Sequence, residues 1–167
     1  MQRRHLLLWP LALLAPTTGL LAGCGFELRR APALPFESIA LSGFSARSPL
    51  AEELKRELSA SAKVVAASER PQVVLQAITD RRDKVVVAAT TAGQVREVQL
   101  RVRFEFRLQS AGGQELLAPI NLLLTRDLSY NETAALAKEY EEAQLYGALQ
   151  SEIVMQVLRR LAVAKKA

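Results

Sequence analysis

The clearest pattern along the chain is a strict alternation of apolar and polar residues from Val98 to Gln109. A period of two places alternate side chains on opposite faces of a β-strand. One face would carry Val98, Leu100, Val102, Phe104, Phe106 and Leu108, and the other Gln99, Arg101, Arg103, Glu105, Arg107 and Gln109. The pattern therefore predicts a strand with one dry face and one solvated face.

Three other segments have strand character, namely residues 36–41, 73–78 and 120–130. The charged run Asp80-Arg81-Arg82-Asp83-Lys84 follows the second segment and is interpreted as a solvated strand end or loop, before an apolar β-branched stretch. Arg126 lies in the apolar register of the last segment. It is either an arginine that extends out to water at the strand's end or one that contacts a ligand.

The first predicted helix covers about residues 49–62. Ser48 suits the N-cap position, and Pro49 suits the first helical position, where its missing N–H costs no hydrogen bond. An apolar stripe at a spacing of four follows, formed by Leu50, Leu54 and Leu58. This spacing is typical of a helix that packs one face on a core.

A second, longer helix is predicted over about residues 133–163. Two caps are available for it, either Ser129 with Glu132 as a capping box or Asn131 alone. Its apolar stripe consists of Tyr146, Leu149, Ile153, Val157 and Leu161, broadened by Leu145, Val154 and Leu158. The stripe predicts packing along much of the helix.

The predicted order of elements is β-α-β-β-β-α. Two helices with one apolar face each, and a sheet with one dry face, suit a two-layer α+β sandwich. Both helices would pack on one face of a four-stranded mixed sheet. This single domain would span residues 36–163, preceded by a tether over 24–35 and followed by a basic tail over 164–167.

Residues 1–23 have the pattern of a secretory signal peptide, with a basic start, a short apolar run and small residues before a cut site. The segment closes on Leu21-Ala22-Gly23-Cys24, the lipobox pattern of bacterial lipoproteins. We expect cleavage before Cys24 and lipid attachment to it. A plain signal peptide with a chance cysteine is one alternative. A transmembrane helix is the other, although the apolar run is shorter than the ~20 residues that a span needs.

Gly25 follows the cysteine, where an aspartate is the usual signal for retention in the inner membrane. Its absence favours the outer membrane, with the domain lipid-anchored and facing the periplasm. Several acyl chains anchor a protein stably, whereas one chain does so only marginally. The outer membrane is therefore an expected partner, reached through the N-terminal lipid.

Cleavage would also limit the available chemistry. The only histidine, His5, lies in the signal peptide, and the only cysteine would be acylated. Histidine-dependent nucleophiles, metal sites and acid–base chemistry are thereby excluded. We predict no catalytic residue, metal site or cofactor, and expect that the protein is not an enzyme. A pair of carboxylates acting alone is the one open route, as in glycosidases.

The mature chain would be mildly basic. Loss of Arg3 and Arg4 from the 22 basic residues leaves 20 against 17 acidic ones, a net charge of +3. This surplus is too small to indicate nucleic acid as a partner. It does suit a ligand that carries phosphates, because Lys and Arg pair with such groups at close range.

Several segments resemble the LptE family of lipopolysaccharide-assembly lipoproteins. The most specific is Leu128-Ser129-Tyr130-Asn131-Glu132-Thr133-Ala134-Ala135-Leu136-Ala137-Lys138-Glu139. Others are residues 21–29, 34–36, 141–142 and 157–161. The resemblance covers the mature chain in element order and lengths. It implies an outer-membrane lipoprotein that assembles lipopolysaccharide at the cell surface with the LptD β-barrel.

The resemblance also implies roles and contacts. The chain would plug the LptD barrel, help it fold and bind lipopolysaccharide. Lys138 matches the family's lysine for which lipopolysaccharide contact is implied, with an exposed first-turn lysine as the alternative. The turn at 90–93 lacks the basic residue that the family often carries, so Arg96, or Arg81 and Arg82, would have to substitute.

The candidate lipopolysaccharide contacts are therefore Lys138, Arg126 and Arg96. The connection between the last strand and the last helix is short, so we expect Arg126 and Lys138 at the same end of the domain. Two other functions stay open. One is a structural lipoprotein that tethers envelope layers through the basic face of the central strand. The other is a carboxylate-only cell-wall hydrolase.

Overall fold

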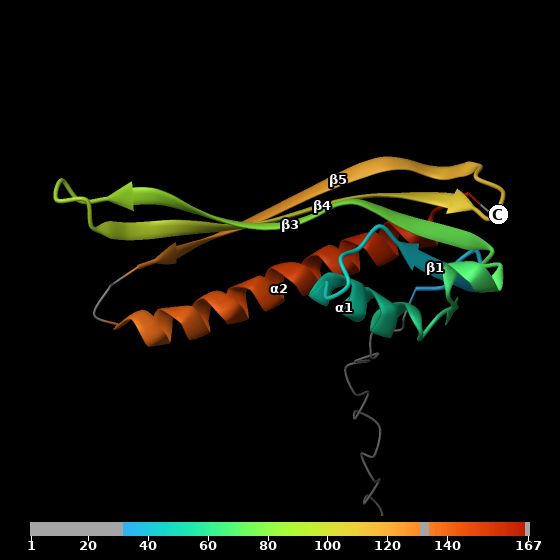
Figure 1. Ribbon diagram of the computed structural model, residues 1–167, viewed down its shortest axis with the longest axis horizontal. Coiled ribbons are helices and arrows are strands. Elements are labelled where there is room, and N and C mark those ends of the chain that lie inside the picture. The colour runs from blue at the N-terminus through green and yellow to red at the C-terminus, as the bar shows by residue number, and fades with distance from the viewer. Residues whose placement is uncertain (1–31, 131–133, 166–167) are drawn as a thin grey trace, which may run out of the picture. The chain divides into compact units, whose positions relative to one another are not determined.

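A computed structural model describes residues 32–130 and 134–165. The elements are β1 (Ser38–Ser42), α1 (Pro49–Leu58), β2 (Lys63–Val64), a 3-10 turn (Ala67–Glu69), β3 (Val73–Ala89), β4 (Val95–Ser110), β5 (Glu115–Ser129) and α2 (Ala135–Ala162). The α+β class is confirmed, and the long elements follow each other as predicted (Figure 1). The signal peptide, Cys24 and most of the tether lie outside the described residues.

The sheet has five strands in the order β2-β1-β3-β4-β5, so the prediction of four strands is wrong. Strand β1 is parallel to both β2 and β3, whereas β3, β4 and β5 form an antiparallel meander. The additional strand, β2, is a two-residue edge in which Lys63 pairs with Ser38 and Val64 with Ile39. Two residues are too few to produce an alternation that a sequence pattern can detect.

Strand β3 is one strand of 17 residues, which corrects the interpretation of residues 80–84 as a strand end or loop. Ala77 pairs with Phe106 and Thr79 with Glu105, so Ile78 is an extra residue in the ladder. An extra residue inverts which parity faces the core beyond it. Val73, Leu75 and Ala77 are buried before this bulge. Beyond it, Asp80, Arg82 and Lys84 bond to the helices or the loop before α1.

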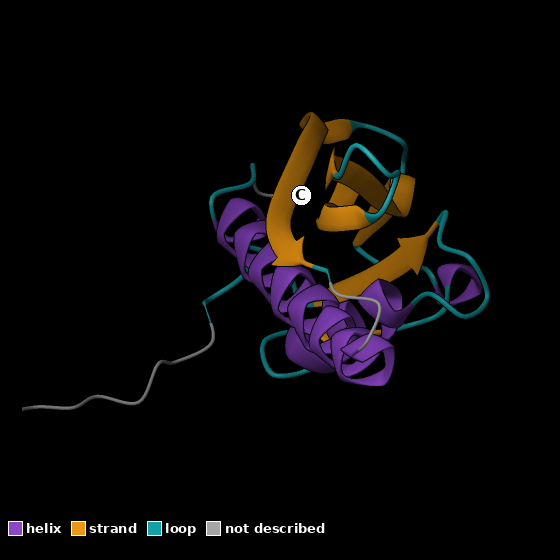
Figure 2. Cartoon of the chain, turned by 90° about the vertical axis from the view of Figure 1, so that its left-hand side faces the viewer, coloured by secondary structure: helices purple, strands orange, loops and turns teal. Residues whose placement is uncertain are grey.

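Both helices cover the same face of the sheet (Figure 2). The predicted dry face of β4 is confirmed, because all six of its apolar residues from Val98 to Leu108 are buried. Phe104 is fully buried and stacks on Phe106 and Phe44, with ring centroids 5.3 and 5.7 Å apart. The predicted stripe of α2 is buried at Leu149, Ile153, Val157 and Leu161, while Tyr146 is half-buried.

Nearby residues determine where helix α1 begins and ends. The Ser48 hydroxyl accepts a hydrogen bond from the Ala51 N–H at 3.1 Å, as expected of an N-cap. Helix α1 ends at Leu58, four residues before the predicted end, because the chain turns there toward β2. The caps predicted for α2 at Asn131 and Glu132 lie outside the described residues.

Candidate functional site

The two ends of the sheet are covered by different helices. Helix α1 and the C-terminal half of α2 lie beneath one end, and the N-terminal half of α2 alone lies beneath the other (Figure 1). We call the second end the distal end and define it as residues 80–98, 126–130 and 134–146. The β3–β4 turn, the end of β5 and the start of α2 come together there.

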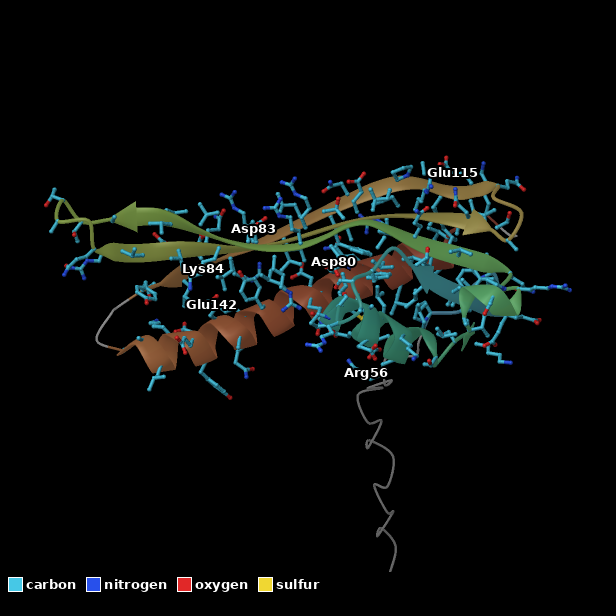
Figure 3. All side chains as sticks on the ribbon, in the orientation of Figure 1. Arg56, Asp80, Asp83, Lys84, Glu115 and Glu142 are labelled. Atoms are coloured by element: carbon cyan, nitrogen blue, oxygen red, sulfur yellow. The ribbon has the colours of Figure 1, made fainter. Side chains whose placement is uncertain are left out.

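A charged groove of about 490 Å³ lies between β3 and α2 at the distal end. The Lys84 ammonium donates to the Glu142 carboxylate at 2.6 Å, and both side chains lie between strand and helix (Figure 3). This bond raises the pKa of Lys84 above its ordinary value of 10.5. Lys84 also lies 5.9 Å from the ring centroid of Tyr130, within cation–π range. The groove is thus lined by cations that already have partners.

Tyr146 closes the inner side of the groove. Its hydroxyl donates to the Asp83 carbonyl oxygen at 3.0 Å, and the Arg82 guanidinium lies 5.6 Å from its ring centroid. Burial raises the pKa of the Tyr146 hydroxyl above 10.0. The phenol therefore stays neutral in the folded protein and serves as a donor rather than as a base.

A buried amide, Gln150, joins the groove to helix α1. It accepts from the Arg82 guanidinium, and its own N–H donates to the Pro49 carbonyl at 3.1 Å and to the Glu53 carboxylate. The side chain is 9 % exposed, so these bonds form in a largely dry setting. Gln150 thereby fixes β3, α1 and α2 relative to one another.

Lys138 lies at the start of α2 and bends back onto the end of β5. Its ammonium donates to the Glu141 carboxylate at 2.7 Å and to the Ser129 hydroxyl at 3.3 Å. The side chain is only 19 % exposed, so it differs from a fully solvated first-turn lysine. A ligand that contacts Lys138 would have to replace or share Glu141.

Arg126 extends from β5 to the middle of α2, where its guanidinium donates to Glu152 at 3.1 Å. Its side chain is 51 % exposed, as expected of an arginine that leaves the apolar register for water. The α2 partners of Arg126 and Lys138, Glu152 and Glu141, are eleven positions or about 16 Å apart along the helix. The structure therefore holds these two cations at separate places.

Arg96 is exposed near the start of β4. Its carbonyl oxygen accepts from the Tyr130 N–H at 2.8 Å, which places it beside the end of β5. Lys138 bonds to the neighbouring Ser129, so Arg96 and Lys138 belong to the same end of the domain. Arg81 and Arg82, the other basic candidates, lie on opposite faces of β3.

Sequence reasoning missed the roles of Lys84, Glu142, Tyr146 and Gln150. Glu142 and Tyr146 are four positions apart, so their shared helix face was visible in the sequence. The face on which Lys84 lies could not be predicted, because the bulge in β3 inverts which residues beyond it point toward the helices. Gln150 lies next to the apolar stripe, where its polar partners on other elements leave no local signal.

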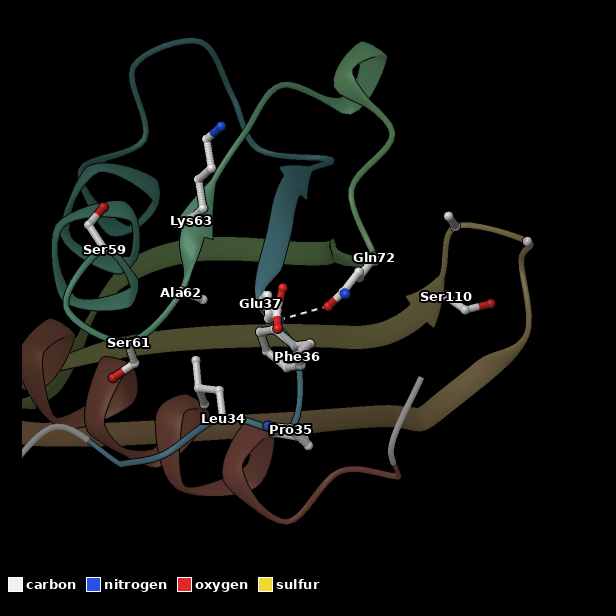
Figure 4. A pocket seen from close by; sticks show the side chains of 12 residues that line it. Leu34, Pro35, Phe36, Glu37, Ser59, Ser61, Ala62, Lys63, Gln72 and Ser110 are labelled. Atoms are coloured by element: carbon white, nitrogen blue, oxygen red, sulfur yellow. Dashed lines mark hydrogen bonds between the residues drawn. The ribbon is translucent and has the colours of Figure 1, made fainter.

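Another concavity, about 1050 Å³ in volume, lies at the opposite end of the domain, beside the start of β1 (Figure 4). It is open, and its walls carry both Glu37 and Lys63. The backbone N–H of Glu37 donates to the Gln72 side chain at 2.7 Å, shown as the dashed line. Lys63 is the one cation among the described residues that line this concavity, so it gathers no set of cations.

Between residues 32 and 165, without 131–133, no group of three or more His, Cys, Asp and Glu side chains is arranged to hold a metal ion. Within the same residues, every helix is too short or too polar to cross a membrane.

These features define a class of protein, an α+β domain in which a long charged helix lies under a three-stranded meander. The chain belongs to the LptE family, because the family model described as "LptE: Lipopolysaccharide-assembly" matches residues 36–161. No curated protein matches the chain.

Solved structures of three lipoproteins are similar to the chain. Lipoprotein B from Nitrosomonas europaea is 33 % identical, with a TM-score of 0.70 over 83 % of this chain and 90 % of that one. Rare lipoprotein B from Shewanella oneidensis is 24 % identical, with a TM-score of 0.63 over 75 % and 94 %. A minor lipoprotein from Acinetobacter baumannii is 16 % identical, with a TM-score of 0.65 over 81 % and 98 %. The last two show the fold alone.

Proposed function

We propose that this chain is an outer-membrane lipoprotein that assembles lipopolysaccharide at the cell surface together with the LptD β-barrel. It would plug the barrel, assist its folding and bind lipopolysaccharide, with no catalytic step of its own. The observation that carries the proposal is the match to the lipopolysaccharide-assembly family over residues 36–161. The lipobox at Leu21-Ala22-Gly23-Cys24 supports lipid anchoring on the periplasmic side of the outer membrane.

The proposed lipopolysaccharide contacts are Lys138, Arg96 and Arg126. Lys138 and Arg96 lie beside the same end of β5, where one anionic head group could reach both. Arg126 would act at a separate place on the ligand, because it pairs with Glu152 farther along α2. Phosphates would compete with Glu141 and Glu152 for these cations. A dianionic phosphate has the advantage, since it carries more charge and more acceptor oxygens than a carboxylate.

Co-purification tests the partnership. A tagged full-length chain extracted from outer membranes should bring down LptD in a stable complex, identified by mass spectrometry. Another outer-membrane lipoprotein with the same tag is the control and should not bring it down. Peptidoglycan fragments in place of the barrel would contradict the proposal and support an envelope tether or a hydrolase.

A second measurement addresses ligand contact. The double variant Lys138→Asp, Arg126→Asp of the full-length chain should bind purified lipopolysaccharide more weakly and still co-purify with LptD. The wild-type affinity should fall as salt rises, because exposed charge contacts are screened. The control is Lys55→Asp, Arg159→Asp, which changes two exposed cations on the helices by the same charge. Equal binding by wild type and the first double variant would exclude these two contacts.

The anchor has its own test. Mass spectrometry of the native N-terminus should detect an acylated cysteine at position 24. An unmodified N-terminus at another residue would contradict lipid attachment at Cys24.

A further inference from the structure

The outer face of the sheet, which points away from both helices, gathers arginines that the fold does not require. Arg81 of β3 lies directly opposite Arg103 of β4 in the antiparallel register. Arg101 is on the same face, two residues before Arg103. Like charges placed opposite each other destabilise a sheet. Neighbours on one face start about 5–7 Å apart, so the three guanidiniums can reach one anion.

The charge on this face is only partly neutralised. Arg81 pairs with Asp83 at 3.1 Å, and Asp83 lies on the side of the sheet away from α2 (Figure 3). Arg101 donates to the neutral amide of Gln99 at 2.8 Å. Arg103 is exposed, and within the described residues no carboxylate oxygen lies within 4.0 Å of its guanidinium. Arg103 is therefore available to a ligand.

This face also has a groove and an apolar border. The groove, about 440 Å³ in volume, runs between the arginines and also contains Glu105. Leu123 of β5 lies directly opposite Arg103 and is 49 % exposed. Ile78, the bulge residue of β3, is 47 % exposed. Guanidiniums next to exposed aliphatic side chains suit a molecule with a phosphate head and a hydrocarbon chain.

The inner groove at the distal end is different, because its two cations already have side-chain partners. Lys84 bonds to the Glu142 carboxylate at 2.6 Å, and Arg82 bonds to the Gln150 amide oxygen. An incoming phosphate must displace a carboxylate there, whereas at Arg103 it displaces only water. We propose that the outer face around Arg81, Arg101 and Arg103 is a second binding site, for a lipid-linked phosphate whose hydrocarbon lies over Ile78 and Leu123. The proposal rests on the proposed function for the source of that phosphate, lipopolysaccharide.

The test compares full-length chains in non-ionic detergent. The triple variant Arg81→Gln, Arg101→Gln, Arg103→Gln should bind purified lipopolysaccharide roughly tenfold or more weakly, since three charge-assisted contacts are lost together. The matched control is Arg47→Gln, Arg56→Gln, Arg159→Gln, which removes the same charge from exposed positions elsewhere and should bind as the wild type does. The triple variant should keep its thermal stability, because it relieves repulsion between opposite arginines.

A gain of binding provides an independent readout. Glu105→Gln removes a negative charge from the groove, so lipopolysaccharide binding should tighten by a small factor. Dephosphorylated lipopolysaccharide should show neither the loss of binding in the triple variant nor the gain of binding in Glu105→Gln. Inorganic pyrophosphate as a competitor separates the two sources of phosphate. If unlabelled lipopolysaccharide displaces bound lipopolysaccharide and pyrophosphate does not, the site needs the lipid as well as the phosphate. If pyrophosphate also displaces it, the phosphate head group suffices. Either result supports a phosphate site.

Three outcomes would overturn the proposal. If the triple variant binds like the wild type, this face is not a site, and the proposed function is unaffected. If the triple variant binds normally but no longer co-purifies with LptD, the arginines contact protein. If the wild type itself does not bind lipopolysaccharide, the lipopolysaccharide-binding part of the proposed function fails together with this site.

Discussion

Strand β3 has two kinds of inner surface, apolar before the bulge at Ile78 and charged beyond it. Before the bulge, Val73 and Leu75 are fully buried in a core that α1 and the C-terminal half of α2 cover. Beyond it, Lys84 pairs with Glu142 across a solvated groove. One strand therefore supports a dry interface and a wet interface against the same helix.

The difference shows how one inserted residue divides a protein into a stable part and an adaptable part. Apolar burial contributes about 25 cal/mol per Å² and depends little on which partner covers the surface. Polar pairs near water contribute less, typically about 0.2–1 kcal/mol each, and can exchange one partner for another. We therefore expect the apolar core beneath β3 before the bulge to set stability, and the polar surfaces beyond it to set ligand contact. The four predictions below test this contrast, from the largest expected effect to the smallest.

Phe104→Ala should lower the free energy of unfolding by about 3–5 kcal/mol, because it truncates a fully buried aromatic side chain. Arg103→Ala, the adjacent residue on the outer face, should change it by no more than about 0.5 kcal/mol. Chemical denaturation of the full-length chain measures both. Equal losses would show that the assignment of the two faces of β4 is wrong.

Gly43→Ala should cost about 2–5 kcal/mol, which combines backbone strain and overpacking. Gly43 has a φ of +80°, and an added Cβ would lie 2.2 Å from the Ala77 carbonyl oxygen, which is backbone and cannot swing away. Gly93 at the distal turn has the same φ but open space around it. Gly93→Ala should therefore cost only about 1–2 kcal/mol. A Gly93→Ala loss as large as that of Gly43→Ala would contradict the contrast.

Gln150→Leu should destabilise the protein by about 1–3 kcal/mol, because it leaves the Arg82 and Glu53 side chains without a shared partner. Gln144→Leu, at an exposed position of α2, is the control and should have little effect. Thermal unfolding gives the comparison. In addition, hydrogen exchange of α1 should speed up in Gln150→Leu, since Gln150 bonds to Pro49 at the start of that helix. Unchanged exchange in α1 would refute the bridging role.

The smallest effect is expected at Lys84. Lys84→Gln should cost only about 0.2–1 kcal/mol near neutral pH, because the ion pair with Glu142 is partly exposed. The pKa of Lys84 is raised in the folded protein. Its contribution to the free energy of unfolding is therefore complete below pH 10.5 and is lost as the pH rises through the folded-state pKa.

Tyr146 also lowers stability as the pH rises. Its pKa is raised in the folded protein, so above pH 10.0 the phenol ionises more readily in the unfolded chain, which favours unfolding. Stability should therefore fall in alkali, and this fall should be shallower in Lys84→Gln. Denaturation midpoints between neutral and strongly alkaline pH provide the measurement. A steeper alkaline loss in Lys84→Gln than in the wild type would contradict this sign.

The candidate site could be predicted only in part. That Arg126 and Lys138 lie toward the same end of the domain could be predicted, because the chain between β5 and α2 is short. The distance between Arg126 and Lys138 could not, since Arg126 extends diagonally to Glu152 rather than toward the start of the helix. The outer arginines were visible as the polar face of β4, but the position of Arg81 opposite Arg103 depends on the register between two strands.

The sequence by itself determined the elements whose patterns are local and long. These are the alternation of β4, the stripe of α2 and the Ser48 cap. Each depends on residues a few positions apart, so each can be recognised without knowledge of the tertiary structure. The tertiary structure alone decided the edge strand β2, the bulge at Ile78 and the bonds of Gln150, one of which joins residues 101 positions apart. Such features depend on which distant groups come together, because a buried polar group needs a partner and a pleated strand must keep its register.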